Sequence, residues 1–110
     1  MNRSYLVFFI LVFMGCSQQS TQDYLSSAKQ HLSQNDFASA SIALKNAIKA
    51  SPDNAEARFL LGKVHLANNK FESAEKELHR AMDSGYPVNE VVPLLSVAYQ
   101  KTGADVALTN

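Results

Sequence analysis

The chain has 110 residues, and its 10 Lys and Arg balance its 10 Asp and Glu, so the formal net charge at pH 7 is zero. This length allows one domain. The basic residues are spread along the chain, which excludes a clustered nucleic-acid-binding surface, and the single cysteine excludes an intrachain disulfide.

A leader is predicted at the start of the chain. A positive charge at Arg3 precedes an unbroken apolar run over residues 5–14, and polar residues follow Cys16. As a helix this run would be about 15 Å long, whereas a bilayer needs roughly 20 apolar residues. We therefore interpret residues 1–15 as a secretory signal peptide and residues 16–22 as a linker.

The segment Phe13-Met14-Gly15-Cys16 resembles a bacterial lipobox. In that signal a peptidase cuts before a cysteine that carries a diacylglycerol. The resemblance implies a covalent lipid on Cys16 and no other cofactor. Ser17, rather than Asp, implies sorting to the outer membrane of a Gram-negative cell, facing the periplasm, in preference to the inner membrane. A plain signal peptide that contains a cysteine, or an uncleaved anchor, is the alternative.

Beyond the leader, the apolar pattern repeats every 34 residues. A fixed period of this length is typical of two-helix units that bury their apolar faces by stacking on neighbours. The pairs one period apart are Ala28 and Gly62, His31 and His65, Leu32 and Leu66, Phe37 and Phe71, Ala40 and Ala74, Leu44 and Leu78, and Ala47 and Ala81.

The first two units are predicted to hold two amphipathic helices each. Apolar spacing of three and four residues predicts a helix over residues 22–34, and Asn35-Asp36 then offers a left-handed turn. The second helix begins at Phe37 and stops at Ser51-Pro52, because proline cannot continue a helix. The second unit repeats this plan, with Asp53 or Asn54 as cap, a turn at Asn68-Asn69, and an end at Gly85-Tyr86-Pro87.

The third unit is predicted to be incomplete. Asn89 opens its first helix, Pro93 lies in or near the first turn, and Gly103 ends the helix. Asp105 and Leu108 then stand where the other units have Phe and Ala, so the second helix fails. We expect an open apolar strip of Leu94, Leu95, Ala98 and Tyr99, and self-association through this uncapped C-terminal helix.

With small, apolar, aromatic and proline positions in this order, the chain resembles tetratricopeptide repeats (TPR). The resemblance implies an all-α fold, a TPR helix-turn-helix solenoid of two full repeats plus a partial third after the lipoprotein signal peptide. The repeats would span residues 21–54, 55–88 and 89–110. His31 and His65 depart from the family pattern, where Tyr is usual.

A narrower resemblance is carried by four short segments. Their sequences are DYL (23–25), ALKNA (43–47), NAEARFLLG (54–62) and AEKEL (74–78). They look like the start of the TPR-repeat lipoproteins that accompany PEP-CTERM/exosortase systems (PrsT-like). That family is lipid-anchored and implicated in exopolysaccharide-linked sorting of surface proteins, and its members hold many repeats. The chain is either a short paralogue or a truncated relative.

In TPR proteins the first helix of each repeat lines a concave face, which implies a partner-binding groove. An apolar groove edged by two lysines suits an extended or helical peptide that carries a carboxylate. The alternative is that both lysines form only a solvated rim. Ser33 and Ala67 lack the groups of the family's chaperone-tail clamp, so chaperone docking is disfavoured. The predicted groove residues are Leu25, Lys29, Leu32, Phe59, Lys63 and Leu66.

No constellation for chemistry is apparent in the sequence. A metal site needs three or four ligands, and His31 and His65 are joined by no cysteine or carboxylate cluster, so we interpret them as substitutes for core aromatic residues. No nucleophile with a base, no phosphate-binding loop and no paired acids are evident, so we expect neither a catalytic residue nor an enzyme.

These patterns predict a lipid-anchored TPR adaptor for protein–protein interaction in the Gram-negative cell envelope, linked to exopolysaccharide export or exosortase sorting. One alternative is a pilotin or outer-membrane assembly lipoprotein that acts through the same groove. A third interpretation is a truncated, non-functional fragment of a longer TPR protein.

Overall fold

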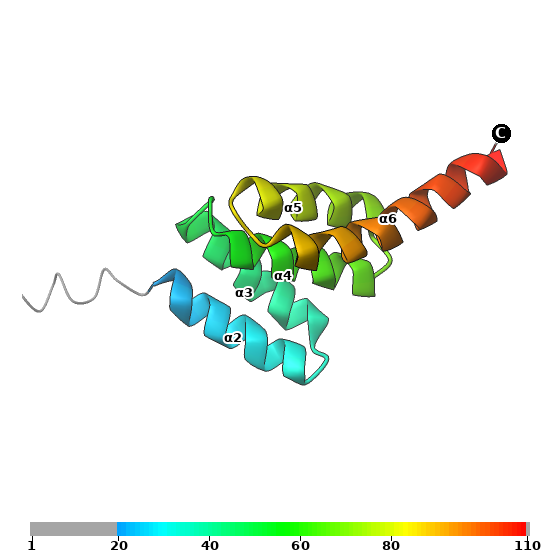
Figure 1. Ribbon diagram of the computed structural model, residues 1–110. Helices are drawn as coiled ribbons and strands as arrows, with labels where there is room; N and C mark the ends of the chain where they lie inside the picture. Colours follow the sequence, from blue (N-terminus) through cyan, green and yellow to red (C-terminus); the bar gives the residue numbers. More distant parts are fainter. Residues whose placement is uncertain (1–19, 110) are drawn as a thin grey trace, which may run out of the picture.

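The computed structural model describes residues 20–109, with side chains described as far as Gly103. The described part is all-helical, as predicted, and each helix packs against the next one along the chain (Figure 1). In addition, α4 contacts α6. The helices are α2 (Thr21–Ser33), α3 (Phe37–Ala50), α4 (Ala55–Ala67), α5 (Phe71–Asp83) and α6 (Val88–Thr109).

The turns between paired helices are the ones that the sequence predicts. Asn35 and Asn69, one period apart, have φ angles of 56° and 59°, the left-handed conformation that asparagine tolerates. Asp36 Oδ1 accepts a hydrogen bond from the Ser39 amide at 3.1 Å and so caps α3. Asn54, one of the two predicted caps, accepts from the Ala57 amide at 2.8 Å and begins α4.

Small residues allow the paired helices to approach closely. Gly62 on α4 lies so near α5 that a Cβ atom there would stand 2.7 Å from Leu78 Cδ2. Ala28 is the equivalent residue in the first repeat and is fully buried. The other small residues of the period, Ala40, Ala47, Ala74 and Ala81, are fully buried as well. Leu60 packs against the core cluster of each repeat, so the two repeats share one continuous core.

The last helix differs from the prediction at two points. Gly103 does not end α6, which continues to Thr109. The space around Gly103 is open, and a helical glycine costs only about 1 kcal/mol relative to alanine. Thr102 Oγ1 donates to Glu75 Oε1 at 2.9 Å and fixes this part of α6 to α5. Pro93 lies inside the helix, beyond its first turn, and only the exposed carbonyl of Asn89 loses a donor.

The expected apolar strip on α6 is also placed differently. Leu95 is 5% exposed and Ala98 fully buried, because both face α5. Leu94 is half-buried, and Tyr99 alone of the expected four is open. Valine side chains elsewhere on α6 are the exposed ones, namely Val88, Val92 and Val97.

Candidate protein-binding face

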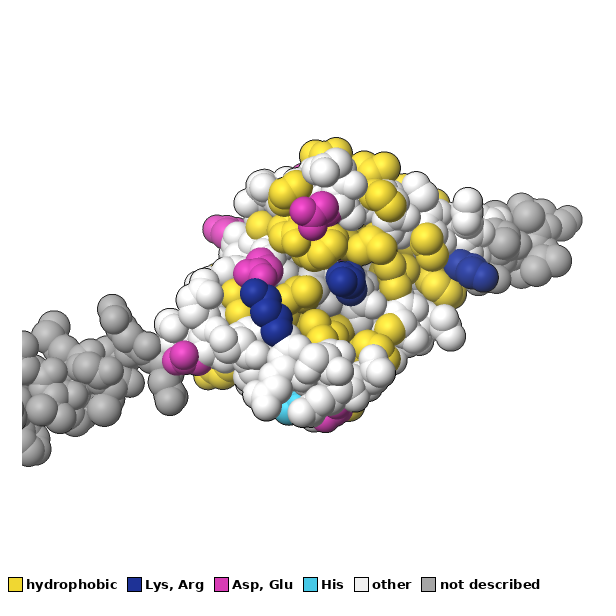
Figure 2. Space-filling view, turned by 60° about the horizontal axis from the view of Figure 1, so that its bottom comes forward, with side chains coloured by type: hydrophobic (Ala, Val, Ile, Leu, Met, Phe, Trp, Pro, Cys, Tyr) yellow, Lys and Arg dark blue, Asp and Glu magenta, His cyan; other side chains and the backbone are white. Residues whose placement is uncertain are grey.

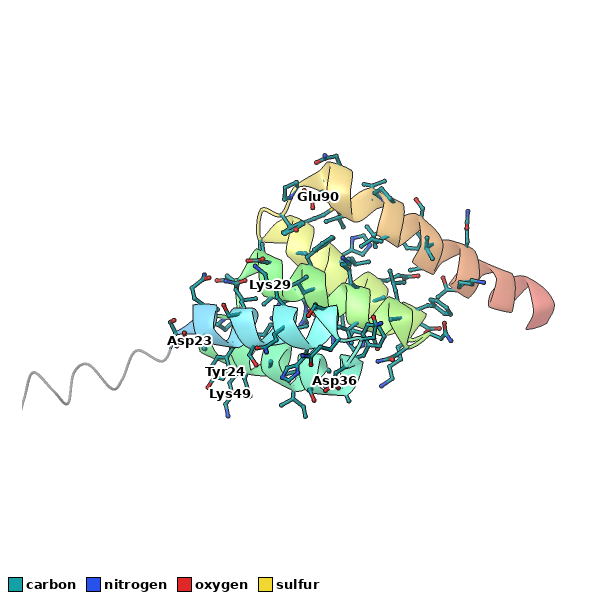
Figure 3. All side chains as sticks on the ribbon, turned by 90° about the horizontal axis from the view of Figure 1, so that it is seen from below. Asp23, Tyr24, Lys29, Asp36, Lys49 and Glu90 are labelled. Atoms are coloured by element: carbon teal, nitrogen blue, oxygen red, sulfur yellow. The ribbon has the colours of Figure 1, made fainter. Side chains whose placement is uncertain are left out.

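The first helices of the repeats, α2, α4 and α6, contribute to one face of the molecule. Figure 2 shows apolar side chains gathered in a central band of this face, with basic and acidic groups beside them. On α4 the residues Glu56, Leu60 and Lys63 are spaced by four and three, which places them on one side of the helix. In Figure 3, Lys29 lies on the side of α2 that is turned toward α4, and Tyr24 lies on the opposite side.

The two predicted lysines occupy this face but have different surroundings. Lys29 Nζ lies 2.5 Å from Glu56 Oε1, so it is already ion-paired with α4. This pair is largely exposed, and we expect it to contribute little to stability. Lys63 Nζ stands 5.8 Å from the centre of the Phe59 ring, and no carboxylate of the described residues lies within 4.0 Å of it.

Two of the predicted groove residues belong to the core instead. Leu25 is 1% exposed and packs between α2 and its neighbours. Phe59 is 7% exposed because its ring stacks on Tyr86, with 4.1 Å between ring centroids and 15° between planes. The expectation that these two side chains face an open groove was therefore wrong. Leu32 and Leu66 are half-buried and retain part of their surface for contact.

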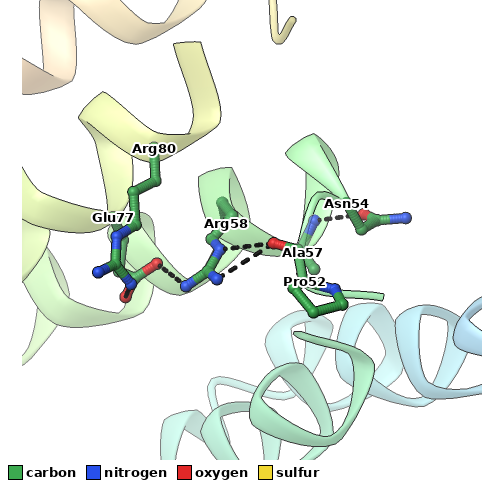
Figure 4. Close-up of polar contacts among 6 residues, drawn as sticks. All are labelled: Pro52, Asn54, Ala57, Arg58, Glu77 and Arg80. Atoms are coloured by element: carbon green, nitrogen blue, oxygen red, sulfur yellow. Dashed lines mark hydrogen bonds and ion pairs between the residues drawn. The ribbon is translucent and has the colours of Figure 1, made fainter. Parts of the chain in front are cut away.

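An ion pair between the helices of the second repeat was not anticipated from the sequence (Figure 4). Arg58 Nη1 donates to Glu77 Oε2 at 2.9 Å, and the two side chains are 13% and 11% exposed. The remaining guanidinium nitrogens donate to the Pro52 carbonyl at 3.2 and 3.1 Å. One arginine thus ties α4 to α5 and to the turn before α4. The equivalent residues of the first repeat, Tyr24 and Ala43, are both uncharged, and this joint change was the available signal.

The histidines lie where the period places them. His31 and His65 are both half-buried, and their interpretation as substitutes for core aromatics stays a prediction. Burial, above all, lowers the pKa of His65, Glu77 opposes this shift, and Lys70 and Lys45 add to it. His79 is exposed, and its ring shares a hydrogen bond with the Tyr99 hydroxyl. Within residues 20–103, no group of three or more His, Cys, Asp and Glu is arranged to hold a metal ion.

The predicted lipidation site, Cys16, lies outside the described residues, as does the whole leader. No helix in the described part is long and apolar enough to cross a membrane.

Comparison with known proteins identifies the fold. The model of the tetratricopeptide repeat family matches residues 31–87, which is just over half of the chain and covers the turns, the caps and the close approach at Gly62. A comparison with curated proteins finds no match. The chain therefore belongs to the tetratricopeptide repeat family, whose repeats act as scaffolds for protein–protein interaction.

Proposed function

We propose that this protein is a lipid-anchored adaptor that holds a peptide segment of a partner against the face formed by α2, α4 and α6. The lipid would be attached at Cys16, in the lipobox-like segment, and the repeats would face the periplasm from the outer membrane. The resemblance of residues 23–25, 43–47, 54–62 and 74–78 to exosortase-system lipoproteins supports a partner in exopolysaccharide export or surface sorting.

The observation that carries the proposal is the position of Lys63. Its ammonium group has no carboxylate partner among the described residues, and it stands over the ring of buried Phe59 on the same face as half-buried Leu60. A peptide carboxylate would supply the missing charge while apolar peptide side chains cover Leu60 and Leu66. Lys29 would contribute less to binding, since its ammonium group is already ion-paired with Glu56.

The test uses a peptide selected from a random library with a free carboxyl terminus. Lys63→Glu should weaken binding of that peptide about three- to tenfold, because charge reversal at a partly exposed site changes the free energy by roughly 1 kcal/mol. The matched control is Lys76→Glu, on an exposed position of α5 away from this face. Equal weakening by both substitutions, or no effect of either, would contradict the proposed face.

The anchor is tested independently of the peptide. Cys16→Ser should abolish labelling of the full-length chain by a palmitate analogue and should block removal of residues 1–15. Two acyl signals make membrane attachment stable, whereas one chain alone is marginal. Labelling that persists in Cys16→Ser would rule out this cysteine as the lipid site and leave the groove proposal untouched.

A further inference from the structure

The first and last helices of the described repeat stack differ in the side chains that they expose. Leu61 on α4 is 4% exposed, since it packs into the core of the first repeat. The equivalent residue on α2 is Ser27, and no helix precedes α2 in the described part. A polar residue in a stacking position is typical of a terminal repeat that ends an array. Among the described residues near that end, Ile42 is the one large apolar side chain that is exposed, and single exposed apolar residues are ordinary.

The other end of the stack carries an apolar stripe. Val88, Val92 and Tyr99 of α6 are 58%, 46% and 46% exposed. Their spacing of four and seven residues places them along one side of the helix, together with Ser96. None of these four residues is charged, so the stripe offers no charged group of its own to water.

The second repeat shows what normally covers this stripe. One period earlier, Arg58 and Gly62 stand in place of Val92 and Ser96. There α5 covers the helix, with Glu77 paired to Arg58 and Leu78 in contact with Gly62. In the third repeat α6 runs on as a single helix through Thr109, so the described residues place no second helix over it. Figure 1 shows the C-terminal half of α6 projecting past the other helices.

We propose that the α6 helix of a second copy of this chain covers the stripe, antiparallel to the first. The paired helices of a repeat are antiparallel because only a short turn joins them, and a second α6 in this orientation would take the same place. With the two-fold axis between Leu95 and Ser96, Val92 of one copy meets Tyr99 of the other, and Val88 meets Gly103.

This arrangement is self-complementary in three respects. Val88, Val92, Ser96 and Tyr99 follow one another at spacings of four, four and three, which keeps them on one side of the helix and available to a partner helix. Because no charged residue lies on the seam, no like charges meet across the two-fold axis. Ser96 and Gly103 leave room for close approach, as Gly62 does for Leu78, and nothing lies within 4 Å of the Cβ position at Gly103.

The seam is also continuous with an interface inside each copy. Leu95 belongs to the core cluster between α4, α5 and α6, and Tyr99 shares a hydrogen bond with His79 of α5. A second α6 would therefore extend an existing packed layer. An overlap of residues 88–103 in each copy would give a contact about 24 Å long at roughly 1.5 Å per residue.

Two valines of α6 provide a matched test of the dimer. Val92 and Val97 are 46% and 44% exposed, but they lie on different sides of the helix. In the full-length chain, purified in a mild detergent, Val92→Glu should raise the dimer dissociation constant at least tenfold in sedimentation equilibrium, and Val97→Glu should leave it unchanged. A wild-type chain that is monomeric at every concentration, or a dimer that tolerates Val92→Glu, would overturn the proposal.

A cross-link tests the orientation without relying on stability. Ser96→Cys, next to the two-fold axis, should form a disulfide-linked dimer in oxidised membranes, whereas Val97→Cys should not. The wild-type chain, with Cys16 as its only cysteine, reports any background. Equal cross-linking of both variants would show that the copies meet elsewhere, and a stable dimer in which Ser96→Cys fails to cross-link would exclude the antiparallel seam.

Discussion

Replacing Gly62 by alanine tests the closest approach between α4 and α5. The new Cβ atom would lie 2.7 Å from Leu78 Cδ2 and 2.8 Å from Cγ, against about 3.5–4.0 Å for relaxed carbon contacts. Leu78 is fully buried and cannot turn into solvent, so overpacking costs about 1–3 kcal/mol. Alanine regains about 1 kcal/mol of helix propensity. The net loss is therefore about 1 kcal/mol, or a Tm lower by about 4–8 °C.

Gly103→Ala is the matched control when both variants are measured at concentrations at which the chain is monomeric, because nothing in the same copy lies within 4 Å of its Cβ position. This substitution should keep Tm or raise it, with a gain of up to about 1 kcal/mol. Circular dichroism at the helical band, followed through heat and urea unfolding, measures both variants. If Gly62→Ala stabilises the chain as much as Gly103→Ala does, the overpacking argument is refuted. A loss of stability in Gly103→Ala would instead indicate that this glycine ends α6 in a left-handed cap.

The Arg58–Glu77 ion pair and half-buried His65 give two further predictions. Arg58→Leu should destabilise the fold by about 2–4 kcal/mol in urea titrations, since Glu77 would stay buried with only the more distant Arg80, at 4.0 Å, as a partner. Arg58→Leu combined with Glu77→Leu should recover most of that loss, and equal losses in the single and double variants would contradict this explanation. Burial lowers the pKa of His65, so the unfolded chain binds more protons: stability is complete above the ordinary pKa of 6.5 and falls as the pH drops below it. The free energy of unfolding from urea titrations should therefore be lower at about pH 5.5 than at about pH 7.5, and His65→Tyr should remove the contribution of His65 to this difference. An unchanged difference in His65→Tyr would show that His65 does not cause it.

The helices and turns of the first two repeats were predictable because local signals agree there. The period, the asparagines at the turns and the cap at Asn54 all point to the same boundaries, and the first predicted helix, 22–34, differs from α2 by one residue at each end. Gly103 was misread because glycine suits both a helix end and an open helical position. Only the contact of Thr102 with α5 distinguishes the two cases, and that contact joins residues far apart in the sequence.

The candidate face was predictable in outline but not in every residue. The face of a helix that contacts the core adjoins the face that lines a groove, so a residue on the border can belong to either. Phe59 turns inward because Tyr86, which follows α5, stacks on its ring. The Arg58–Glu77 pair likewise joins two helices, and the sequence next to either residue does not indicate that the two side chains meet. Lys29 and Lys63 lie one period apart on α2 and α4, as the repeat predicts, and their role in binding stays a prediction.

Each helix finds its main partner in the helix that precedes or follows it, and this has a consequence for how the chain folds. Contacts between neighbours close short loops, so little chain entropy is lost before packing begins, and helical proteins of this kind fold in microseconds to milliseconds. The α2–α3 hairpin can form before α5 has been delivered, whether the chain arrives from a ribosome or through a membrane pore. Its apolar side would remain unprotected until α4 arrives with Leu60, so vectorial delivery favours folding from the amino-terminal repeat onward.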